Sequence, residues 1–267
     1  MMNISKQNLL TVKINTWSII NNEMDYLKDI VPFHLEWVDL MYFLDTGSTD
    51  GSFELLQEFA AKDNRIVVEK YHTPYSPDHS VEWREMKNPF PEVEVRNYAL
   101  TQVEKLSQFG DWLIQLDGDE IFLPKTRKII EQSKKSIISH STINPVEDLN
   151  KHPIEVRSGL TLHDPHARIW RKCAGVRYMQ NPAMKGKQFH CIPAKEGRHV
   201  YHSALNEFTD EIFHFHLHWM YGKKVDAFYS KLGITDRKEI WLKQKLNKFG
   251  GFVPKVFWER RKDWLSE

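Results

Sequence analysis

The sequence predicts an α/β fold in which helices cover the faces of a mainly parallel sheet, and two observations support this. Over residues 1–125, short apolar runs of strand length alternate with segments whose apolar residues recur at helical spacing. Two of these runs end directly in acidic residues and turn formers, in "LMYFLDTGSTDGS" and in "WLIQLDGDEIFLP". Such strand–helix alternation is typical of a parallel sheet flanked by helices.

Each expected element follows from its own pattern. Continuous apolar or β-branched runs predict strands at residues 9–20, 38–45, 65–71 and 112–117. Apolar residues at helical spacing predict helices at residues 22–37, 52–63 and 92–107. Pro32 lies inside the first helix and is expected to kink or break it.

The alternation weakens after Pro124, which makes this residue the best candidate for a boundary between two halves of the chain. The remaining expected elements are a helix at 127–141, strands at 166–172 and 211–219, and helices around 225–233 and 237–249.

Composition excludes several classes of protein. An apolar fraction of 41% over 267 residues argues against disorder, and a net charge of +1 makes nucleic acid an unlikely partner. Two cysteines do not form a disulfide framework, so a reducing compartment is expected. No signal-peptide pattern is visible, and no apolar stretch approaches the roughly 20 residues that span a bilayer. The expected localisation is therefore cytoplasmic, with no transmembrane segment.

Three aspartates follow two of the predicted strands. In an open parallel sheet, ligands bind outside the carboxyl ends of the strands, where Asp45 and the Asp117/Asp119 pair would meet. Without compensation these carboxylates would repel one another, and a divalent cation removes that cost. Carboxylate oxygens are natural ligands of Mg²⁺ and Mn²⁺, and Gly118 would let the chain turn tightly between the acids. The alternative is a pair of ordinary solvated turns.

A family resemblance rests on three blocks of sequence. Residues 20–52, "INNEMDYLKDIVPFHLEWVDLMYFLDTGSTDGS", are followed by "VRNYAL" and by "GDWLIQLDGDEIFLP", which contains an Asp-x-Asp motif. Together they resemble the nucleotide-binding half of the GT-A glycosyltransferases, closest to family 2 and the family-92-like group. The resemblance implies a GT-A fold. Residues 1–125 would be the nucleotide-sugar-binding half, and residues 126–267 the acceptor-side half with C-terminal helices, in one continuous domain.

The resemblance also implies contacts with the nucleotide. Asp45 would hydrogen-bond the nucleoside, and Arg96 would lie against the nucleotide from the preceding helix, unless it is a surface arginine. The first strand would supply a further contact, from Thr16 or Ser18.

At the Asp-x-Asp motif, the resemblance implies that Asp117 reaches the ribose, a metal-bound water or the metal itself. Asp119 would ligate the metal that bridges the diphosphate. The metal would neutralise charge on the leaving nucleoside diphosphate.

Three histidines, His214, His216 and His218, are spaced two apart and would share one face of a strand. The resemblance implies that one of them is a further metal ligand. The spacing to Trp219 favours His216, whereas the following "KKVDAFYSKLG" favours His218. A separate Zn²⁺ site and simple packing are the alternatives. A mixed carboxylate and imidazole set favours Mn²⁺ over Mg²⁺.

An inverting transfer needs a carboxylate base to take the acceptor proton. By resemblance the base falls near "TDEIF", at Asp210 or Glu211, and Asp164 is the other candidate. Each of the three could equally be an ordinary surface acid.

The predicted function is a metal-dependent glycosyltransferase. It would move a sugar from a nucleotide-diphosphate donor, with UDP favoured, to a carbohydrate or other hydroxyl acceptor, with inversion. A nucleotidyltransferase or metal hydrolase is one alternative, and the absence of a glycine-rich phosphate loop counts against it. The other alternative is a non-catalytic nucleotide- or carbohydrate-binding module.

Overall fold

The computed structural model describes residues 12–71, 91–147, 153–158, 166–180 and 191–216. The strands of this part of the chain are β1 Ile14–Ile20, β2 Leu40–Asp45, β3 Ile66–Lys70, β4 Trp112–Gln115, β5 Glu120–Phe122, β6 Ile137–Glu147, β7 Pro153–Ser158, β8 His166–Arg171, β9 Arg177–Gln180, β10 Cys191–Lys195, β11 Arg198–His199 and β12 Asn206–His216. The α-helices are α1 Met24–Leu35, α2 Ser52–Lys62, α3 Glu92–Leu106 and α4 Lys125–Gln132, and two short 3-10 helices are η2 Lys172–Ala174 and η4 Val200–His202.

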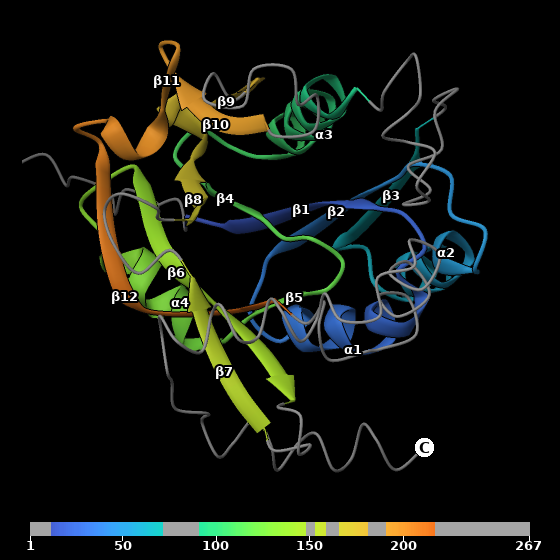
Figure 1. The fold of residues 1–267 in the computed structure, drawn as a ribbon. Helices are drawn as coiled ribbons and strands as arrows, with labels where there is room; N and C mark the ends of the chain where they lie inside the picture. The colour runs from blue at the N-terminus through green and yellow to red at the C-terminus, as the bar shows by residue number, and fades with distance from the viewer. Residues whose placement is uncertain (1–11, 72–90, 148–152, 159–165, 181–190, 217–267) are drawn as a thin grey trace, which may run out of the picture.

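One large sheet runs through the molecule in the order β3-β2-β1-β4-β8-β6-β12-β5, with β7 paired to β6 (Figure 1). The strands β3, β2, β1 and β4 run parallel to one another. From β8 onward the pairing is mixed, since β8 runs antiparallel to both β4 and β6, whereas β12 is parallel to β6. A smaller antiparallel sheet, β11-β10-β9, lies beside α3.

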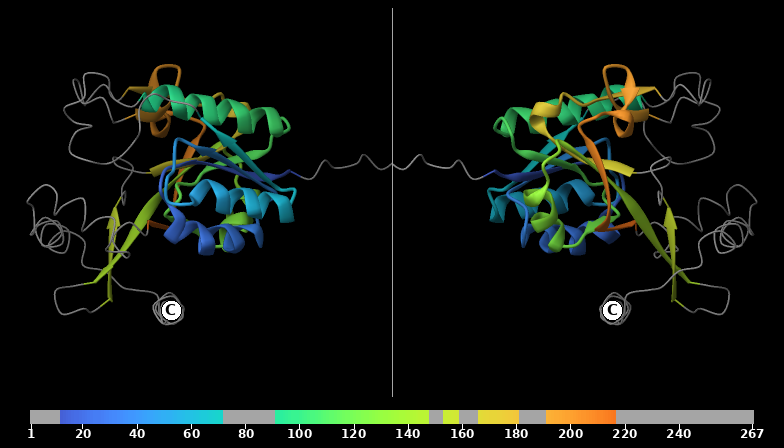
Figure 2. Two further views of the ribbon diagram at one scale, coloured as in Figure 1. Left: turned by 90° about the vertical axis from the view of Figure 1, so that its right-hand side faces the viewer. Right: turned by 90° about the vertical axis from the view of Figure 1, so that its left-hand side faces the viewer.

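Helices cover both faces of the large sheet, which confirms the predicted α/β fold (Figures 1 and 2). On one face, α1, α2 and α4 contribute Leu27, Leu56 and Ile130 to a core formed with the sheet. On the other face, α3 contributes Val95, Ala99, Leu100 and Val103 to a second core. Burial of these apolar stripes is the main force that holds the layers together.

The early elements match their predictions, and two details differ. Pro32 does not break α1, which continues to Leu35. The helix expected at residues 127–141 ends at Gln132, and β6 begins at Ile137. The change of structure has a physical reason, because Ile137 and Ile138 are fully buried against β8 and β12 and β-branched residues suit such positions.

The sheet contains strands from both sides of residue 125. β8 pairs with β4, and β12 pairs with β5, so elements distant in sequence meet at its centre and at its edge. The strand expected at 166–172 corresponds to β8, and β12 carries the first part of the strand expected at 211–219. The helices expected at 225–233 and 237–249 lie outside the described residues. None of the helices in the described part of the chain is long and apolar enough to cross a membrane.

Candidate functional site

The acids that follow β4 form a tight turn into β5, called here the acid turn (residues 117–120). The backbone N–H of Glu120 donates to the carbonyl of Asp117 at 3.1 Å. In return, the backbone N–H of Asp117 donates to Glu120 Oε2 at 2.9 Å. The turn is therefore closed by its own first and last residues.

Gly118 is required in the acid turn because of a close approach. A Cβ atom at this position would lie 2.8 Å from Glu23 Cγ and 2.9 Å from Ile20 Cδ1, closer than real Cβ contacts allow. Gly118 has no positive φ, so conformational freedom is not what selects glycine here. The residue lets the turn lie directly against the end of β1 and the start of α1.

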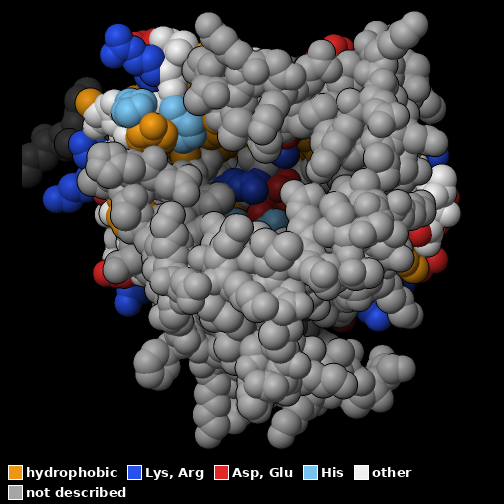
Figure 3. Space-filling model, in the orientation of Figure 1, with side chains coloured by type: hydrophobic (Ala, Val, Ile, Leu, Met, Phe, Trp, Pro, Cys, Tyr) orange, Lys and Arg blue, Asp and Glu red, His pale blue; other side chains and the backbone are white. Residues whose placement is uncertain are grey.

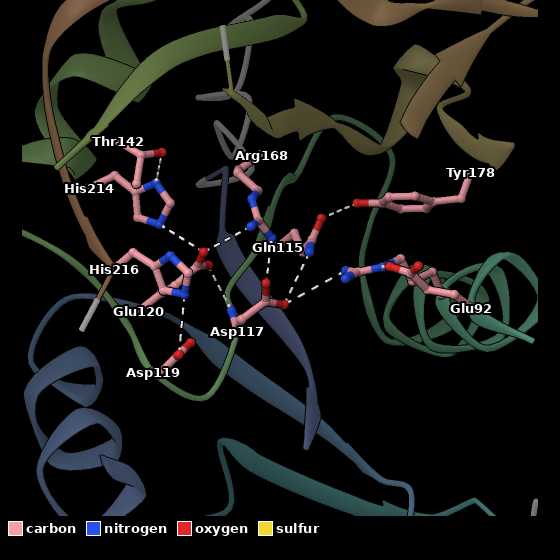
Figure 4. A network of polar contacts seen from close by, with 11 residues as sticks. Glu92, Gln115, Asp117, Asp119, Glu120, Thr142, Arg168, Tyr178, His214 and His216 are labelled. Carbon is pink, nitrogen blue, oxygen red and sulfur yellow. Dashed lines mark hydrogen bonds and ion pairs between the residues drawn. The ribbon is translucent and has the colours of Figure 1, made fainter. Parts of the chain in front are cut away.

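Arg168 joins the two ends of the acid turn from the neighbouring strand β8 (Figure 4). Its Nη1 donates to Asp117 Oδ2 at 2.9 Å, and its Nη2 donates to Glu120 Oε1 at 2.8 Å. Burial by itself would raise the pKa of Glu120, but the guanidinium of Arg168 outweighs it and holds that pKa well below its usual range. Glu120 is therefore a buried, charged and paired carboxylate.

A second arginine approaches the same turn from α3. Arg96 Nη1 lies 3.7 Å from Asp117 Oδ1, and its Nε donates to Glu92 at 2.9 Å. These contacts correct one step of the sequence argument. The charge of Asp117 does not require a metal, because the two arginines already neutralise Asp117 and Glu120. Asp117, which was predicted as a possible metal ligand, accepts hydrogen bonds on both oxygens.

A line of hydrogen bonds connects Asp117 to α3 and the small sheet (Figure 4). Gln115 Nε2 donates to Asp117 Oδ1 at 3.1 Å, and the Tyr178 hydroxyl donates to Gln115 Oε1. The side-chain amide of Asn97 then holds the backbone of Tyr178, with contacts of 2.9 and 2.8 Å. Burial raises the pKa of Tyr178 far above its usual value, so this hydroxyl stays protonated and able to donate.

Asp119, the third residue of the acid turn, has a different partner. Asp119 Oδ2 lies 3.2 Å from Nε2 of His216, and the pairing of β12 with β5 sets His216 opposite Glu120. Burial alone would lower the pKa of His216, but the carboxylate of Asp119 outweighs it and raises the pKa to about 9. The structure thus brings together one predicted metal aspartate and the favoured histidine.

Asp119 and His216 fit a divalent metal by their chemistry and spacing. Adjacent ligands of an octahedral ion with bonds near 2.1 Å lie about 3 Å apart, close to the 3.2 Å between these two atoms. An oxygen and an imidazole nitrogen form a donor set that suits Mn²⁺. Within the residues that the structure describes, no three histidine, cysteine, aspartate or glutamate side chains are arranged to hold a metal ion. The described chain therefore offers two ligands.

His214 points into the protein interior, where it packs against core side chains. It is fully buried, stacks on Phe122 with ring centroids 4.3 Å apart, and contacts the Thr142 hydroxyl through Nδ1 at 3.1 Å. Its Nε2 lies 3.3 Å from Glu120 Oε1. The structure therefore sets His214 apart from the Asp119–His216 pair, and His218 lies outside the described residues.

Asp45 ends β2 at the same edge of the sheet and is fully buried. Its Oδ1 accepts from the backbone N–H groups of Gly47 and Ser48 at 3.0 and 3.1 Å. Its Oδ2 has no hydrogen-bond partner among the described residues. Oδ1 thus holds the turn, while Oδ2 is left to accept a further hydrogen bond, as the predicted nucleoside contact would need.

Thr16 and Ser18 lie in the middle of β1, and both are buried. The carboxyl end of β1 is Ile20, which pairs with Asp45. Thr16 and Ser18 lie four and two residues before that end, and their contact with the nucleotide stays a prediction.

Of the predicted bases, Glu211 lies apart from the Asp119–His216 pair. Glu211 is exposed on β12, five residues before His216, and a strand rises about 3.3 Å per residue, so the two lie on the order of 15 Å apart. Asp210 lies in the irregular pairing between Thr209 and His214. Asp164 is outside the described residues.

Sequence reasoning missed Arg168 and Gln115 as site residues. One signal was present for Gln115: it is a polar residue in an apolar strand, two positions before Asp117 and thus on the same face. Arg168 stands alone among apolar neighbours in "HARIW", which is also unusual for a buried strand.

No protein-family model matches the sequence, and no curated protein matches it. Among solved structures, the chain is similar to S. aureus TarS 1-349, with 16% identity over 61% of this chain and 48% of that chain and a TM-score of 0.38. It is also similar to mannosyltransferase PcManGT from Pyrobaculum calidifontis in complex with GDP-Man and Mn²⁺, with 12% identity over 48% and 34% and a TM-score of 0.34. A third is 4-diphosphocytidyl-2C-methyl-D-erythritol synthase, with 10% identity over 61% and 76% and a TM-score of 0.36. The chain spans about half of the first of these structures and a third of the second. Similarity at this level carries no argument about function, which must come from the geometry of the site.

Proposed function

We propose that this protein is a metal-dependent glycosyltransferase that moves a sugar from a nucleotide-diphosphate donor to a hydroxyl acceptor. The observation that carries the proposal is the meeting of Asp45, the acid turn and His216 at one edge of the sheet. In the sheet order, β1 lies between β2 and β4, so the acids that follow those two strands flank its carboxyl end. This is where open α/β sheets bind nucleotides.

The residues divide into a nucleoside side and a diphosphate side. On the nucleoside side, the unused Oδ2 of Asp45 is the acceptor for a donor group of the nucleoside. On the diphosphate side, Asp119 and His216 would hold Mn²⁺, or Mg²⁺ in its place, which would supply positive charge for the leaving diphosphate. Two protein ligands leave coordination positions for phosphate oxygens and water. We further propose that the donor is a UDP-sugar, as the resemblance implies.

Transfer with inversion also needs a carboxylate base. Glu211 lies away from the Asp119–His216 pair, which favours Asp164 among the predicted candidates. In the proposed reaction this carboxylate takes the acceptor proton while the sugar leaves the diphosphate on its opposite face. Asp164→Asn should therefore abolish transfer while donor binding stays within twofold of wild type, and a loss of both would exclude this role.

A binding module without turnover is the second candidate, and the distance of Glu211 from His216 favours it. The two candidates differ in one measurable property. A transferase slowly hydrolyses its sugar nucleotide when no acceptor is present, and a binding module does not. Release of UDP from UDP-glucose and UDP-N-acetylglucosamine over hours would distinguish them.

The proposal is tested by thermal unfolding with UDP, GDP and CDP, each with and without Mn²⁺. A ligand at a hundred times its dissociation constant stabilises the folded state by about 2.7 kcal/mol. We expect one nucleotide to raise the melting temperature only with Mn²⁺, and Asp119→Ala to lose this shift. Glu196→Ala, on an exposed side chain far along the sequence from the acid turn, is the matched control. No shift with any nucleotide would contradict the proposal.

A further inference from the structure

Two guanidinium groups converge on one carboxylate at the candidate site. Arg168 donates to Asp117 at 2.9 Å, and Arg96 lies 3.7 Å from the other oxygen of the same residue. The side chains of both arginines are 18% exposed, so each charge is largely removed from solvent. Bringing two buried cations together is unfavourable unless negative groups surround them.

Acidic partners fix both arginines in place. Glu92 holds Arg96 through Nε, Glu120 holds Arg168 through Nη2, and Asp117 lies between them. The three carboxylates keep both guanidiniums charged and oriented before any ligand arrives. An oriented guanidinium loses little conformational entropy when it binds a ligand, which is why arginine suits phosphate recognition.

One donor of this pair is unused. Arg96 Nη1 is buried and has no hydrogen-bond partner among the described residues, because its contact with Asp117 is too long for a hydrogen bond. A buried N–H without an acceptor is costly, and an oxygen from a ligand would remove that cost. The acid turn also sets Asp119, the proposed metal ligand, two residues from Asp117. In Figure 3, basic, acidic and histidine side chains are visible together near the middle of the face.

From this arrangement we infer that Arg96 and Arg168 together form an anion subsite that receives the diphosphate of the donor, and that Asp117 positions them. Arg168 thereby joins the site as a binding residue, and Asp117 acts through the arginines. The inference rests on the proposed function, which supplies the nucleotide diphosphate as the ligand. A charge-assisted hydrogen bond from the unused Nη1 of Arg96 to a phosphate oxygen gives this subsite its preference for a diphosphate over a neutral group.

The test measures binding of UDP, inorganic pyrophosphate and uridine by calorimetry in the presence of Mn²⁺. Arg168→Met alone leaves the buried carboxylate of Glu120 without its counter-charge, so the decisive variant is Arg168→Met combined with Glu120→Gln, which removes both charges of the buried pair. Arg177→Met is the matched control, because its guanidinium pairs with Glu104 at 2.8 Å on the surface. Glu120→Gln alone shows the effect of Glu120 with Arg168 in place.

We expect the double variant to fold, to bind UDP and pyrophosphate at least tenfold more weakly than wild type, and to bind uridine as wild type does. Equal affinity of wild type and double variant for pyrophosphate and UDP would overturn the inference. If Mn²⁺-dependent UDP binding is nevertheless lost in Asp119→Ala, the proposed function stands without the arginine subsite. A different result would be that the double variant loses pyrophosphate binding while wild type binds UDP no tighter than pyrophosphate. That result would support the arginine subsite and contradict a nucleotide as the donor.

Discussion

The two ends of the candidate site are constructed in different ways. At the end of β2, Asp45 accepts from Gly47 and Ser48, which follow it by two and three residues. At the end of β4, Asp117 and Glu120 depend on Arg168, which is 51 and 48 residues away along the chain. The first end is local and follows from a short stretch of sequence. The second exists only when β8, α3 and β12 have assembled around the acid turn.

The largest expected effect comes from removing Arg168, on which the non-local end of the site depends. Arg168→Met should destabilise the fold by about 3–5 kcal/mol, because it leaves the carboxylate of Glu120, which is 1% exposed, buried without its counter-charge. Urea unfolding measures the change. Adding Glu120→Gln should recover most of the loss, and Arg177→Met should change stability by less than about 1 kcal/mol. A single variant as stable as wild type would show that the ion pair contributes nothing.

The second prediction concerns the strand after the acid turn. His34 on α1 donates through Nδ1 to the carbonyl of Ile30 at 2.8 Å and accepts through Nε2 from the N–H of Phe122 at 3.1 Å. These bonds require the neutral ring, and burial lowers the pKa of His34 to about 4.

The unfolded chain therefore takes up a proton near pH 6.5 and the folded protein only near pH 4. Stability from this residue is complete above pH 6.5 and falls as the pH is lowered toward 4, by about 3 kcal/mol. Unfolding free energies at intervals between these pH values measure the slope. His34→Gln should be less stable at neutral pH and show a shallower slope, and an unchanged slope would contradict the assignment.

A third prediction compares one glycine from each end of the site. Gly118→Ala should cost about 1–3 kcal/mol through contact with Ile20 and Glu23. Gly47→Ala should cost a similar or smaller amount for a different reason, since Gly47 has a φ of +110° and no atom within 4 Å of a new Cβ. Ile20→Val removes the Cδ1 atom that the Gly118→Ala methyl meets. A double-mutant cycle should therefore show coupling between Ile20→Val and Gly118→Ala and none with Gly47→Ala.

The smallest expected effect concerns Tyr178, which belongs to the line of hydrogen bonds that ends at Asp117. Tyr178→Phe removes only the hydroxyl that donates to Gln115, and should cost about 1 kcal/mol of stability. If Gln115 helps to hold Asp117, UDP affinity should fall severalfold in Tyr178→Phe. In a Gln115→Ala background the same substitution should have no further effect on affinity. Additive losses in the double variant would show that Tyr178 does not act through Gln115.

Local pattern was sufficient for the first half of the fold. Apolar runs and helical spacing predicted the parallel strands and three helices, because those elements bury faces whose period is visible in the sequence. The prediction failed at residues 127–141, where a helical pattern continues into β6. There the burial of Ile137 and Ile138 in the sheet decides the structure, and local spacing does not record it.

In the candidate site too, some residues follow from local pattern and others only from the tertiary structure. The roles of Asp45, Asp119 and His216 stay predictions, but the places of the two aspartates at strand ends and of His216 in an alternating histidine run could be predicted. The role of Arg168 could not, since nothing near residue 168 shows that β8 pairs with β4 and sets this side chain beside the acid turn. From the sequence, a metal is therefore the only expected source of charge compensation for these acids.

The sequence by itself determined the α/β alternation, the acids at two strand ends and the glycine between them, because these depend on short-range sterics and on periodicity. The tertiary structure decided which charges meet. It paired Arg168 with Asp117 and Glu120, and His216 with Asp119, because electrostatic contacts depend on distance in space and several strands separate these partners in sequence. It also separated His214 from the Asp119–His216 pair by burying its ring against Phe122 and beside Glu120.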